Sequence, residues 1–399
     1  MADRLRVLFA MGSLAGGGAE RQLIGILNHL DRTRFTPLLY LVDRRGELLE
    51  EVPDDVPVFS FWERYRRPRW NYPGLLHRMK AHDLAAVMCE ESIQVIYDRT
   101  MSMTLIAAAA TRRIGVPRIS VVTNDPQHDF DDSVKRFRLA KRCLLTRAYR
   151  QATRVVAVSE GIRKSTIDRF RLAPAQVTTA YNLLDLDRIA RLATERATDL
   201  DHDRFHIVTV GSLARQKGLR YLLLALDEVV SRGRMPKLLL SILGQGPLED
   251  ELKALVQLKR LDENVRFEGY VANPFSIIKQ SQLYCLSSIY EGMPNALLEA
   301  MACGVPVLAT DCPSGPSEVL DRGRFGHLVP PAEPEALAAA IEDAVNNYEA
   351  WRALAPYAQQ HVADTFSVEA GMAKLESLLV GVHSEATNRT GSQSQAAAG

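Results

Sequence analysis

The sequence has few of the features that hold a secreted or membrane-spanning protein together. Its 399 residues include five cysteines, which are scattered and form no C-x-x-C pair. That pattern argues against a disulfide framework or a zinc site and indicates a reducing compartment. No apolar run approaches the roughly 20 residues that a membrane-spanning helix needs. The formal net charge is only +1, so no global field attracts nucleic acid or a membrane.

The beginning of the sequence also lacks a targeting pattern. A strand-like run starts at Leu5 with no signal peptide before it. We therefore expect a cytoplasmic protein that is at most peripheral on the inner face of the cytoplasmic membrane.

Short apolar runs alternate with longer helical patterns, and they do so twice along the chain. This alternation predicts an α/β protein built from two doubly wound, Rossmann-like domains with parallel sheets. The expected strands are 6–11, 35–42, 56–61, 93–97, 118–123 and 154–159 in the first half, and 205–210, 237–243, 265–268, 283–287, 305–309 and 327–329 in the second.

The domain boundaries follow from composition. We expect a first domain at 1–185, a charged linker at 186–204 and a second domain at 205–366. A helix over 367–380 is expected to pack back on the first domain. Residues 381–399 show no periodicity and are expected to be disordered.

The stretch from Glu291 to Val307 contains two carboxylates eight positions apart, Glu291 and Glu299. Pro294 suits the first turn of a helix, which leaves Glu291 in the preceding loop and places Glu299 in the second turn. The amides of the helix start would favour an anion there; they belong to Asn295, Ala296 and Leu297. An ordinary amphipathic helix with two surface carboxylates has the same spacing.

Glycine-rich turns follow the first strand of each half. Gly16, Gly17 and Gly18 match neither G-x-G-x-x-G nor the P-loop pattern, but they would let a phosphate approach the backbone. In the second half, Arg215 and Lys217 follow a Gly211 turn and suit a diphosphate. Each turn taken alone is also typical of a flexible loop with solvated charges. A further turn at Gly269 and Tyr270 could contact a base.

These features combine into a pattern that resembles a known family. The Glu-x7-Glu stretch is preceded by Gly244-Gln245-Gly246-Pro247 and followed by Gly304-Val305-Pro306-Val307 and Cys312-Pro313-Ser314-Gly315-Pro316. Together they resemble the retaining glycosyltransferases of the group 1, family 4-like kind, which include sucrose synthase and bacterial capsule and lipopolysaccharide sugar transferases. The resemblance implies the GT-B fold, with two Rossmann-like domains facing across a cleft.

The resemblance also implies roles for the residues. Glu299 would hold the ribose, Glu291 the donor sugar, and Arg215 with Lys217 the diphosphate. Tyr270 and the amides of residues 295–297 would add contacts to the nucleotide, and the glycines 16–18 would close over the donor. No metal and no cofactor are expected, because side-chain cations and a helix end compensate the charge.

One position departs from the family pattern. Such proteins often carry a histidine after the fifth strand, where this sequence has Asn124 and Asp125, with His128 displaced. We therefore keep Asp125 and His128 as competing candidates, and a surface histidine is equally consistent. Asp129-Phe130-Asp131 resembles a metal-binding D-x-D, but we expect an N-cap over residues 131–133 instead.

Two basic stretches suit the acceptor side. From Lys135 to Arg154 eight cations occur without an acid, at partly amphipathic spacing. From Phe61 to Trp70 aromatic residues are interleaved with the arginines of Arg64–Arg69. Either could bind an anionic membrane surface or a lipid-linked acceptor; a solvated scaffold helix has the same charge pattern. Nucleic acid is not expected as a partner.

The sequence thus predicts a hexosyltransferase-type enzyme. It would move a hexose or N-acetylhexosamine from a nucleoside diphosphate sugar, expected to be a UDP-sugar, to a glycan acceptor, expected to be lipid-linked, in cell-surface polysaccharide or glycolipid synthesis. A GT-B nucleotide-sugar epimerase and a sugar-nucleotide-binding protein without turnover remain as alternatives.

Overall fold

The computed structural model describes residues 4–68, 70, 72–134, 137–195, 203–233 and 237–397. The chain divides into two compact units. Unit 1 comprises Met1–Leu183 and Val368–Gly399, and unit 2 comprises Leu184–Ser367. Among the described residues, no helix has an apolar stretch long enough to cross a bilayer.

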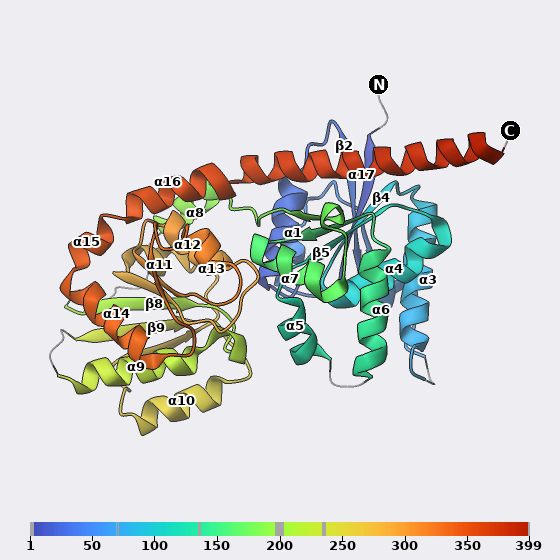
Figure 1. Ribbon diagram of the computed structural model, residues 1–399. Coiled ribbons are helices and arrows are strands. Elements are labelled where there is room, and N and C mark those ends of the chain that lie inside the picture. Colours follow the sequence, from blue (N-terminus) through green and yellow to red (C-terminus); the bar gives the residue numbers. More distant parts are fainter. Residues whose placement is uncertain are drawn as a thin grey trace. The chain divides into compact units, whose positions relative to one another are not determined.

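Unit 1 contains a seven-stranded parallel sheet (Figure 1). Its strand order is β3-β2-β1-β4-β5-β6-β7. The strands are β1 (Leu5–Met11), β2 (Phe35–Leu41), β3 (Val58–Ser60), β4 (Val95–Arg99), β5 (Arg118–Val122), β6 (Arg154–Ala157) and β7 (Val177–Thr179). Its helices are α1 (Gly18–His29), η1 (Glu47–Glu51), α2 (Phe61–Arg64), α3 (Leu75–Glu90), α4 (Met101–Ile114), α5 (Pro126–Ser133), α6 (Arg138–Arg150), α7 (Glu160–Phe170), η2 (Pro174–Gln176) and α17 (Val368–Ala397).

Unit 2 contains a six-stranded parallel sheet of order β10-β9-β8-β11-β12-β13. The strands are β8 (Phe205–Val210), β9 (Leu238–Leu243), β10 (Val265–Gly269), β11 (Leu283–Leu286), β12 (Val307–Thr310) and β13 (His327–Val329). The helices are α8 (Leu186–Ala193), η3 (Arg215–Lys217), α9 (Leu219–Ser231), α10 (Glu249–Leu258), α11 (Phe275–Gln280), α12 (Asn295–Ala302), α13 (Pro316–Val319), α14 (Pro334–Asn346), α15 (Tyr348–Arg352) and α16 (Ala355–Phe366). Two such domains are the GT-B fold, as the sequence predicted.

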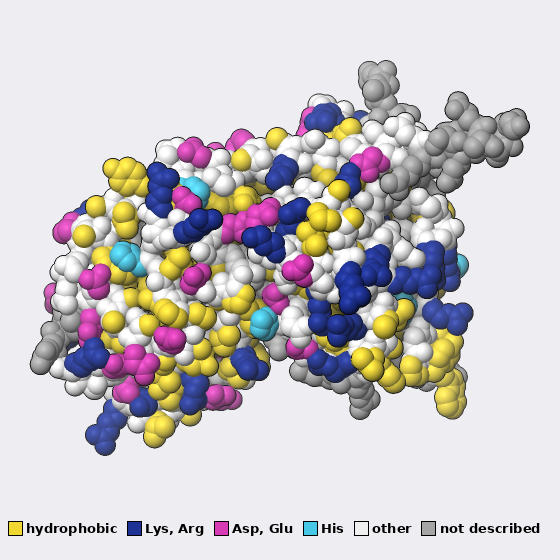
Figure 2. All heavy atoms as spheres, in the orientation of Figure 1, with side chains coloured by type: hydrophobic (Ala, Val, Ile, Leu, Met, Phe, Trp, Pro, Cys, Tyr) yellow, Lys and Arg dark blue, Asp and Glu magenta, His cyan; other side chains and the backbone are white. Residues whose placement is uncertain are grey.

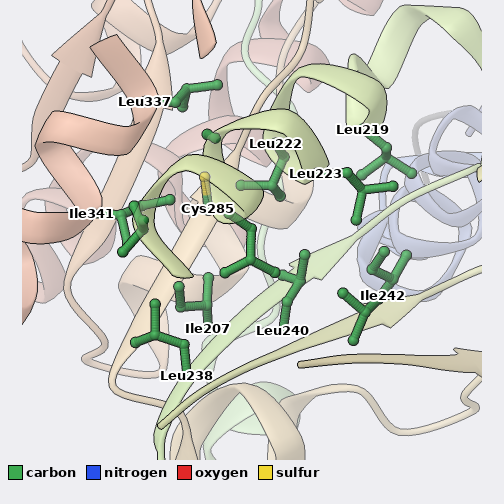
Figure 3. Packing of buried hydrophobic residues seen from close by; sticks show 14 of the residues in the cluster. Ile207, Leu219, Leu222, Leu223, Leu238, Leu240, Ile242, Cys285, Leu337 and Ile341 are labelled. Carbon is green, nitrogen blue, oxygen red and sulfur yellow. The ribbon is translucent and has the colours of Figure 1, made fainter. Parts of the chain in front are cut away.

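Each sheet is buried, as the continuous apolar runs of parallel strands require. In unit 2, side chains of β8 and β9 pack against α9 and α14, with Leu240, Leu223 and Ile341 fully buried (Figure 3). In unit 1, β1 and β2 pack against α3 and α4. The strand order of each sheet reverses once, between β1 and β4 in unit 1 and between β8 and β11 in unit 2. Ligands of doubly wound sheets bind beyond the strand ends at such a reversal.

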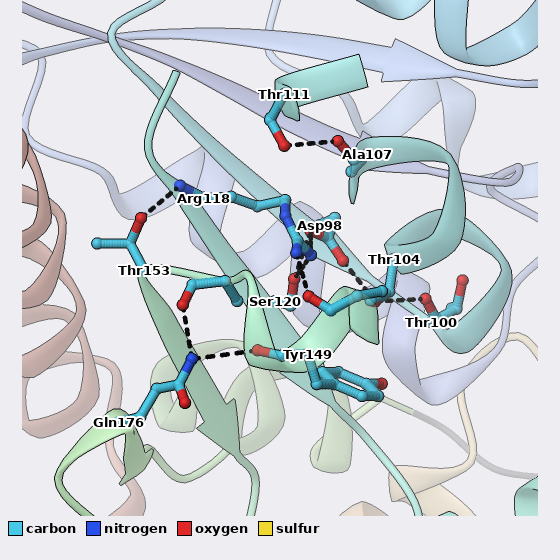
Figure 4. A network of polar contacts seen from close by, with 12 residues as sticks. Asp98, Thr100, Thr104, Ala107, Thr111, Arg118, Ser120, Tyr149, Thr153 and Gln176 are labelled. Atoms are coloured by element: carbon cyan, nitrogen blue, oxygen red, sulfur yellow. Dashed lines mark hydrogen bonds and ion pairs between the residues drawn. The ribbon is translucent and has the colours of Figure 1, made fainter. Parts of the chain in front are cut away.

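A buried polar network joins the helices of unit 1 to its sheet (Figure 4). The guanidinium of Arg118, on β5, lies 3.4 Å from an Asp98 carboxylate oxygen on β4. Ser120 and Thr104 donate to the same carboxylate over 2.7 and 2.5 Å. Burial raises the pKa of Asp98, while Arg118 and these hydroxyls oppose the rise. Arg118 and the hydroxyls of Ser120 and Thr104 therefore offset part of the cost of burying the Asp98 carboxylate.

The chain boundaries differ from the expected ones. The chain passes from unit 1 to unit 2 between Leu183 and Leu184 and returns between Ser367 and Val368. Helix α8 occupies part of the expected linker. Residues 196–202 of that linker lie outside the described part. The segment 381–399, expected to be disordered, continues α17 to Ala397. That segment contains no proline, which would interrupt a helix, and it includes four alanines, the residue with the highest helix propensity.

The C-terminal helix packs on unit 1. Glu376 of α17 accepts from the Asp31 amide over 3.1 Å and pairs with Arg34 at 2.8 Å. The helix therefore closes unit 1 although it follows the whole of unit 2 in sequence.

Candidate functional site

Two loops of unit 2 meet at the reversal point of its sheet. One follows β8 and contains η3; the other follows β11 and leads into α12. The Ile289 amide donates to the Gln216 carbonyl over 2.8 Å, and the Ser287 hydroxyl donates to the Lys217 carbonyl over 2.9 Å. Gly218 has φ +60°, and a Cβ there would overlap the Ser287 carbonyl oxygen. This glycine is therefore required for the close approach of the two loops.

A partly buried ion pair connects the same loops. Glu291 is only 4% exposed, and its Oε1 lies 2.7 Å from Lys217 Nζ. The Ser288 hydroxyl donates to Oε1 over 2.6 Å, and Gln216 Nε2 lies 3.3 Å from Oε2. The carboxylate thus has a cation and two neutral donors, which offset the cost of burying its charge. Sequence reasoning singled out Glu291 and Lys217 but missed Ser288 and Gln216.

The second carboxylate lies near the first. Glu299 is half-buried in the second turn of α12, as expected from the position of Pro294. Burial raises the pKa of Tyr284 well above its ordinary value, and the charges of Glu291 and Glu299 both add to this rise. Both carboxylates therefore lie close enough to the Tyr284 phenol to affect its pKa.

The start of α12 is less open to an anion than its sequence suggests. Pro294 occupies the N-cap position, and no side chain caps the helix. The Asn295 amide donates to the Met293 carbonyl over 3.0 Å, and the Leu297 amide donates to the Pro294 carbonyl over 3.0 Å. Two of the three amides assigned to the nucleotide are thus already bonded; Ala296 lies between them.

The remaining candidates of unit 2 are accessible. Arg215 is exposed beside the buried pair, and Tyr270 is 46% exposed after β10. Gly244 has φ +136°, and a Cβ there would overlap the Gly211 carbonyl oxygen. The Gly244 amide donates to the Gly269 carbonyl over 2.7 Å. The carboxyl ends of β8, β9 and β10 are therefore held together beside the ion pair.

Two buried thiols lie near the candidate carboxylates. Burial raises the pKa of Cys312 to about 12, and the charge of Glu291 adds to the rise. Burial raises the pKa of Cys303 to about 12 as well, with a contribution from Glu299. Both side chains are therefore thiols at neutral pH and are not nucleophiles.

The glycine-rich loop of unit 1 leads directly into α1. Gly17 is the N-cap and Gly18 the first residue of the helix, while Gly16 has φ +100°. Gly17 and Gly18 are exposed. The loop follows β1, one of the two strands at the reversal point of this sheet, so it lies where the sequence placed it within unit 1.

Asp125 caps a helix that the sequence did not predict. Its Oδ1 accepts from the Gln127 and His128 amides over 2.9 and 3.0 Å and lies 2.9 Å from His128 Nδ1. The Ser165 hydroxyl donates to Oδ2 over 2.9 Å. Burial acts to raise the pKa of Asp125, but the bonds from His128, Ser165 and Gln127 together lower it below its ordinary value. Asp125 thus holds His128, whose ring is partly exposed.

The expected N-cap over residues 131–133 is wrong. Those residues end α5, which starts at Pro126, because proline at the first helical position and aspartate before it form the stronger start signal. Asp131 instead binds Gln127 Nε2 over 2.6 Å and pairs with Arg138. The second aspartate of the D-x-D sequence, Asp131, is therefore already paired with the side chain of Arg138.

Part of the aromatic–arginine stretch is structural. Arg64 Nε lies 2.9 Å from a buried Asp83 oxygen, and its Nη2 lies 3.0 Å from Glu90. Arg67 lies over the Trp62 ring at 5.6 Å. Arg64 thus forms ion pairs with two carboxylates of α3, whereas Arg66 and Arg67 are exposed. Arg69, Lys135 and Arg136, which the sequence assigned to the membrane or acceptor, lie outside the described residues.

Two family models match the chain, one in each unit. A model described as "Glycosyl transferases group 1" matches residues 191–361, and a model described as "Glycosyltransferase Family 4" matches residues 16–188. Together they span both units. The chain belongs to the group 1 glycosyltransferases.

Curated relatives of this glycosyltransferase match part of its length. An N-acetylgalactosamine-N,N'-diacetylbacillosaminyl-diphospho-undecaprenol 4-alpha-N-acetylgalactosaminyltransferase of Campylobacter jejuni is 31% identical over 191 residues, 48% of this chain and 50% of that protein. A UDP-Gal:alpha-D-GlcNAc-diphosphoundecaprenol alpha-1,3-galactosyltransferase of Escherichia coli is 24% identical over 237 residues, 57% of this chain and 60% of that protein. The chain spans about half the length of the curated relatives it matches.

Solved structures share the fold along almost the whole chain. HepE of Anabaena, solved in complex with UDP-glucose, matches with a TM-score of 0.77 and 21% identity, covering 95% of this chain and 100% of that one. A sucrose-phosphate synthase of Thermosynechococcus elongatus matches with a TM-score of 0.74 and 17% identity, covering 96% and 100%.

Proposed function

We propose that this glycosyltransferase is a retaining enzyme. It transfers a hexose or N-acetylhexosamine from a nucleoside diphosphate sugar to a lipid-linked glycan in the synthesis of a cell-surface polysaccharide or glycolipid. The Lys217–Glu291 pair supports this proposal most directly, because it places a cation and an acceptor for hydroxyl groups at the reversal point of the unit 2 sheet. The nucleotide is proposed to be UDP, the nucleotide named in the HepE complex and the E. coli relative.

Different residues of unit 2 would bind different parts of the donor. Arg215, exposed at the start of η3, and Lys217 would bind the diphosphate as a planar fork and a compact ammonium. Glu299 would accept from the ribose hydroxyls, and Glu291 from those of the sugar. Ser288 and Gln216 would keep the Glu291 carboxylate oriented when Lys217 turns toward the phosphate. Tyr270 is proposed to contact the base.

The proposed chemistry needs no base from the protein. The bond between the anomeric carbon and the diphosphate oxygen breaks, and the acceptor hydroxyl oxygen forms a new bond to the same face of that carbon. The acceptor proton passes to the departing phosphate oxygen. Arg215 and Lys217 stabilise the charge that develops on the leaving group, and we propose that no metal or cofactor takes part.

An exposed face of unit 1 supports a membrane-bound acceptor. On α6, cations such as Arg138, Arg142 and Arg147 are exposed together with Leu139, which is 80% exposed, and Leu144. Figure 2 shows Lys and Arg side chains gathered over the α6 region of unit 1, with hydrophobic side chains beside them. The inward face of α6, which includes Leu145, is buried. Cations mixed with apolar residues on a solvent face suit an anionic lipid surface.

A liposome assay tests the membrane role. Arg138, Arg142 and Arg147 are replaced together by Glu, and sedimentation with phosphatidylglycerol vesicles is measured across salt concentrations. Binding should weaken and lose most of its salt dependence. The control is a variant in which three exposed arginines of unit 2 are replaced by Glu in the same way: Arg220, Arg266 and Arg352. This variant should bind the vesicles as wild type does. Unchanged sedimentation of the α6 variant would refute this role.

Turnover tests the transferase proposal itself. The purified protein is incubated with a panel of nucleoside diphosphate sugars, with and without a bacterial lipid extract, and free nucleotide and product anomeric configuration are measured. A retaining transferase releases nucleoside diphosphate only with acceptor and keeps the anomeric configuration of the donor sugar. Release of a rearranged sugar without acceptor would indicate an epimerase, and binding without turnover would indicate a binding protein.

A further inference from the structure

Unit 1 encloses a small cavity that the proposed transfer reaction does not use. It has a volume of about 20 Å³ and lies at the carboxyl end of β4. Tyr97, Val121 and Val156, on three neighbouring strands, form its floor; α1 and α17 contribute Ile26 and Leu375. It therefore lies within unit 1, between the sheet and the two helices that cover this face.

An arginine without a full set of partners lines this cavity. Arg99 is only 3% exposed, and its Nε has no hydrogen-bond partner. Its Nη1 lies 3.5 Å from the Tyr97 hydroxyl and its Nη2 lies 3.5 Å from the Asn182 side-chain oxygen. Both distances are at the outer limit of hydrogen bonding. A guanidinium has five N–H donors, so most of the bonding capacity of Arg99 is unmet.

The described residues that line the cavity provide no carboxylate to Arg99. The other large buried arginine of unit 1, Arg118, has Asp98 beside it at 3.4 Å (Figure 4). A buried charge without a partner is costly, because it has left water and gained no opposite charge. An external anion would remove this cost at Arg99.

The polar side chains nearest to Arg99 are neutral. Burial raises the pKa of Tyr97, and although the charge of Arg99 acts to lower it, the net shift is upward. The phenol therefore stays protonated and cannot neutralise the guanidinium. Its oxygen accepts from Arg99, which leaves its own proton able to point into the cavity. Gln22 is occupied, because its side chain exchanges hydrogen bonds of 2.8 and 2.6 Å with the Leu183 backbone.

We propose that this cavity binds one small monovalent anion of halide size, with Arg99 as its counter-charge and Tyr97 as a second donor. The volume is that of a single water-sized particle, which is too small for a phosphate group. Water would fit but would leave the charge uncompensated. The apolar walls formed by Val121 and Val156 favour a weakly hydrated anion over a strongly hydrated one.

The position of the cavity gives the anion a structural consequence. Asn182 and Leu183 lead to Leu184, where the chain enters unit 2, and α17 begins where it returns. Gly371 of α17 lies so close to Leu183 that a Cβ there would overlap its side chain. The anion would thus link β4 to Asn182 and Leu183, which precede the passage of the chain into unit 2. Through Leu183 it would also be linked to α17, which follows the return of the chain to unit 1. Halide should stabilise unit 1 whatever reaction the protein catalyses.

Bromide locates the site directly. Crystals of the full-length protein are grown in sodium bromide and anomalous diffraction is measured at the bromine edge. The proposal predicts a peak within hydrogen-bonding distance of Arg99 and Tyr97. Electron density for a water without anomalous signal, or bromide only at the surface, would overturn it.

Thermal unfolding provides the second measurement. In sodium chloride or bromide, Tm should exceed that in sodium gluconate of equal ionic strength by a few degrees, and the increase should saturate. Arg99→Met should abolish the difference, and Arg220→Met, at an exposed arginine, should preserve it. If Arg99→Met does not fold, Tyr97→Phe should raise the halide concentration at half-effect several-fold. A halide effect that is equal in wild type and Tyr97→Phe, or absent from wild type, would contradict the proposal.

Discussion

The two charged pairs beside the candidate sites are positioned in different ways. Lys217 and Glu291 are 74 positions apart in the sequence and meet because β8 and β11 are neighbouring strands. Asp125 and His128 are three positions apart and meet because the aspartate caps the helix that contains the histidine. The first pair depends on the topology of the sheet, whereas the second requires only one helical turn.

This difference assigns different roles to the pairs. The unit 2 pair is held by bonds from two loops that no local preference would bring together, and its lysine follows a strand at the reversal point. The unit 1 pair satisfies the ordinary demand of a helix start for acceptors. We therefore assign charge compensation to Lys217 and a positioning role to Asp125.

The largest expected effect is on turnover. Lys217→Ala should lower the transfer rate by at least ~100-fold, because a contact to the leaving group is lost and Glu291 remains buried without its cation. Initial rates of nucleoside diphosphate release measure this effect. Lys253→Ala removes a lysine that pairs with Glu249 on the surface and should leave the rate unchanged. Equal rates in the two variants would refute the assignment of Lys217.

An intermediate effect is expected on the contact between the loops. Gly218→Ala adds a Cβ that overlaps the Ser287 carbonyl oxygen at φ +60°. Gly233→Ala is a matched control, because Gly233 has φ +64° with open space around it. Both substitutions cost about 1–2 kcal/mol for the left-handed backbone. Gly218→Ala should lower the free energy of unfolding measurably more than the control; an equal loss would show that the loops need not approach so closely.

The smallest effect is expected at the helix cap. Asp125→Ala should reduce stability by about 1 kcal/mol. Because the folded state lowers the pKa of Asp125, its charge stabilises the protein above the unfolded pKa, and this contribution is lost as pH falls through the folded value.

Asp125→Asn separates the charge from the cap, because asparagine is also a good N-cap. Thermal unfolding between pH 6 and pH 3 should show a shallower loss of stability in the Asn variant than in wild type. Parallel curves would contradict a charged role for this residue.

Much of the fold was predictable because its signals are local and repeated. All twelve expected strands are present, and the added strand β7 was missed because Val177 is the only apolar residue among its three. The extension of α17 was not predicted because residues 381–399 show no periodicity. Asp125-Pro126 carries a helix-start signal that lies before the N-cap expected at residues 131–133.

The candidate site was predictable only in part. Glu291, Glu299, Arg215 and Lys217 could be selected as charges near predicted strand ends. That Lys217 pairs with Glu291 could not, because the pairing depends on the order of strands in the sheet. Ser288 and Gln216 have no sequence signal of their own and become visible only as donors to a buried carboxylate.

Calorimetric titration with UDP tests the central claim most directly, since it measures binding at unit 2 without an acceptor. Wild type and Lys253→Ala should bind UDP equally, and Lys217→Ala should bind it at least ~10-fold more weakly, as expected for a lost charge-assisted contact. Equal affinity in all three proteins would contradict the claim that the joined loops of unit 2 hold the nucleotide diphosphate.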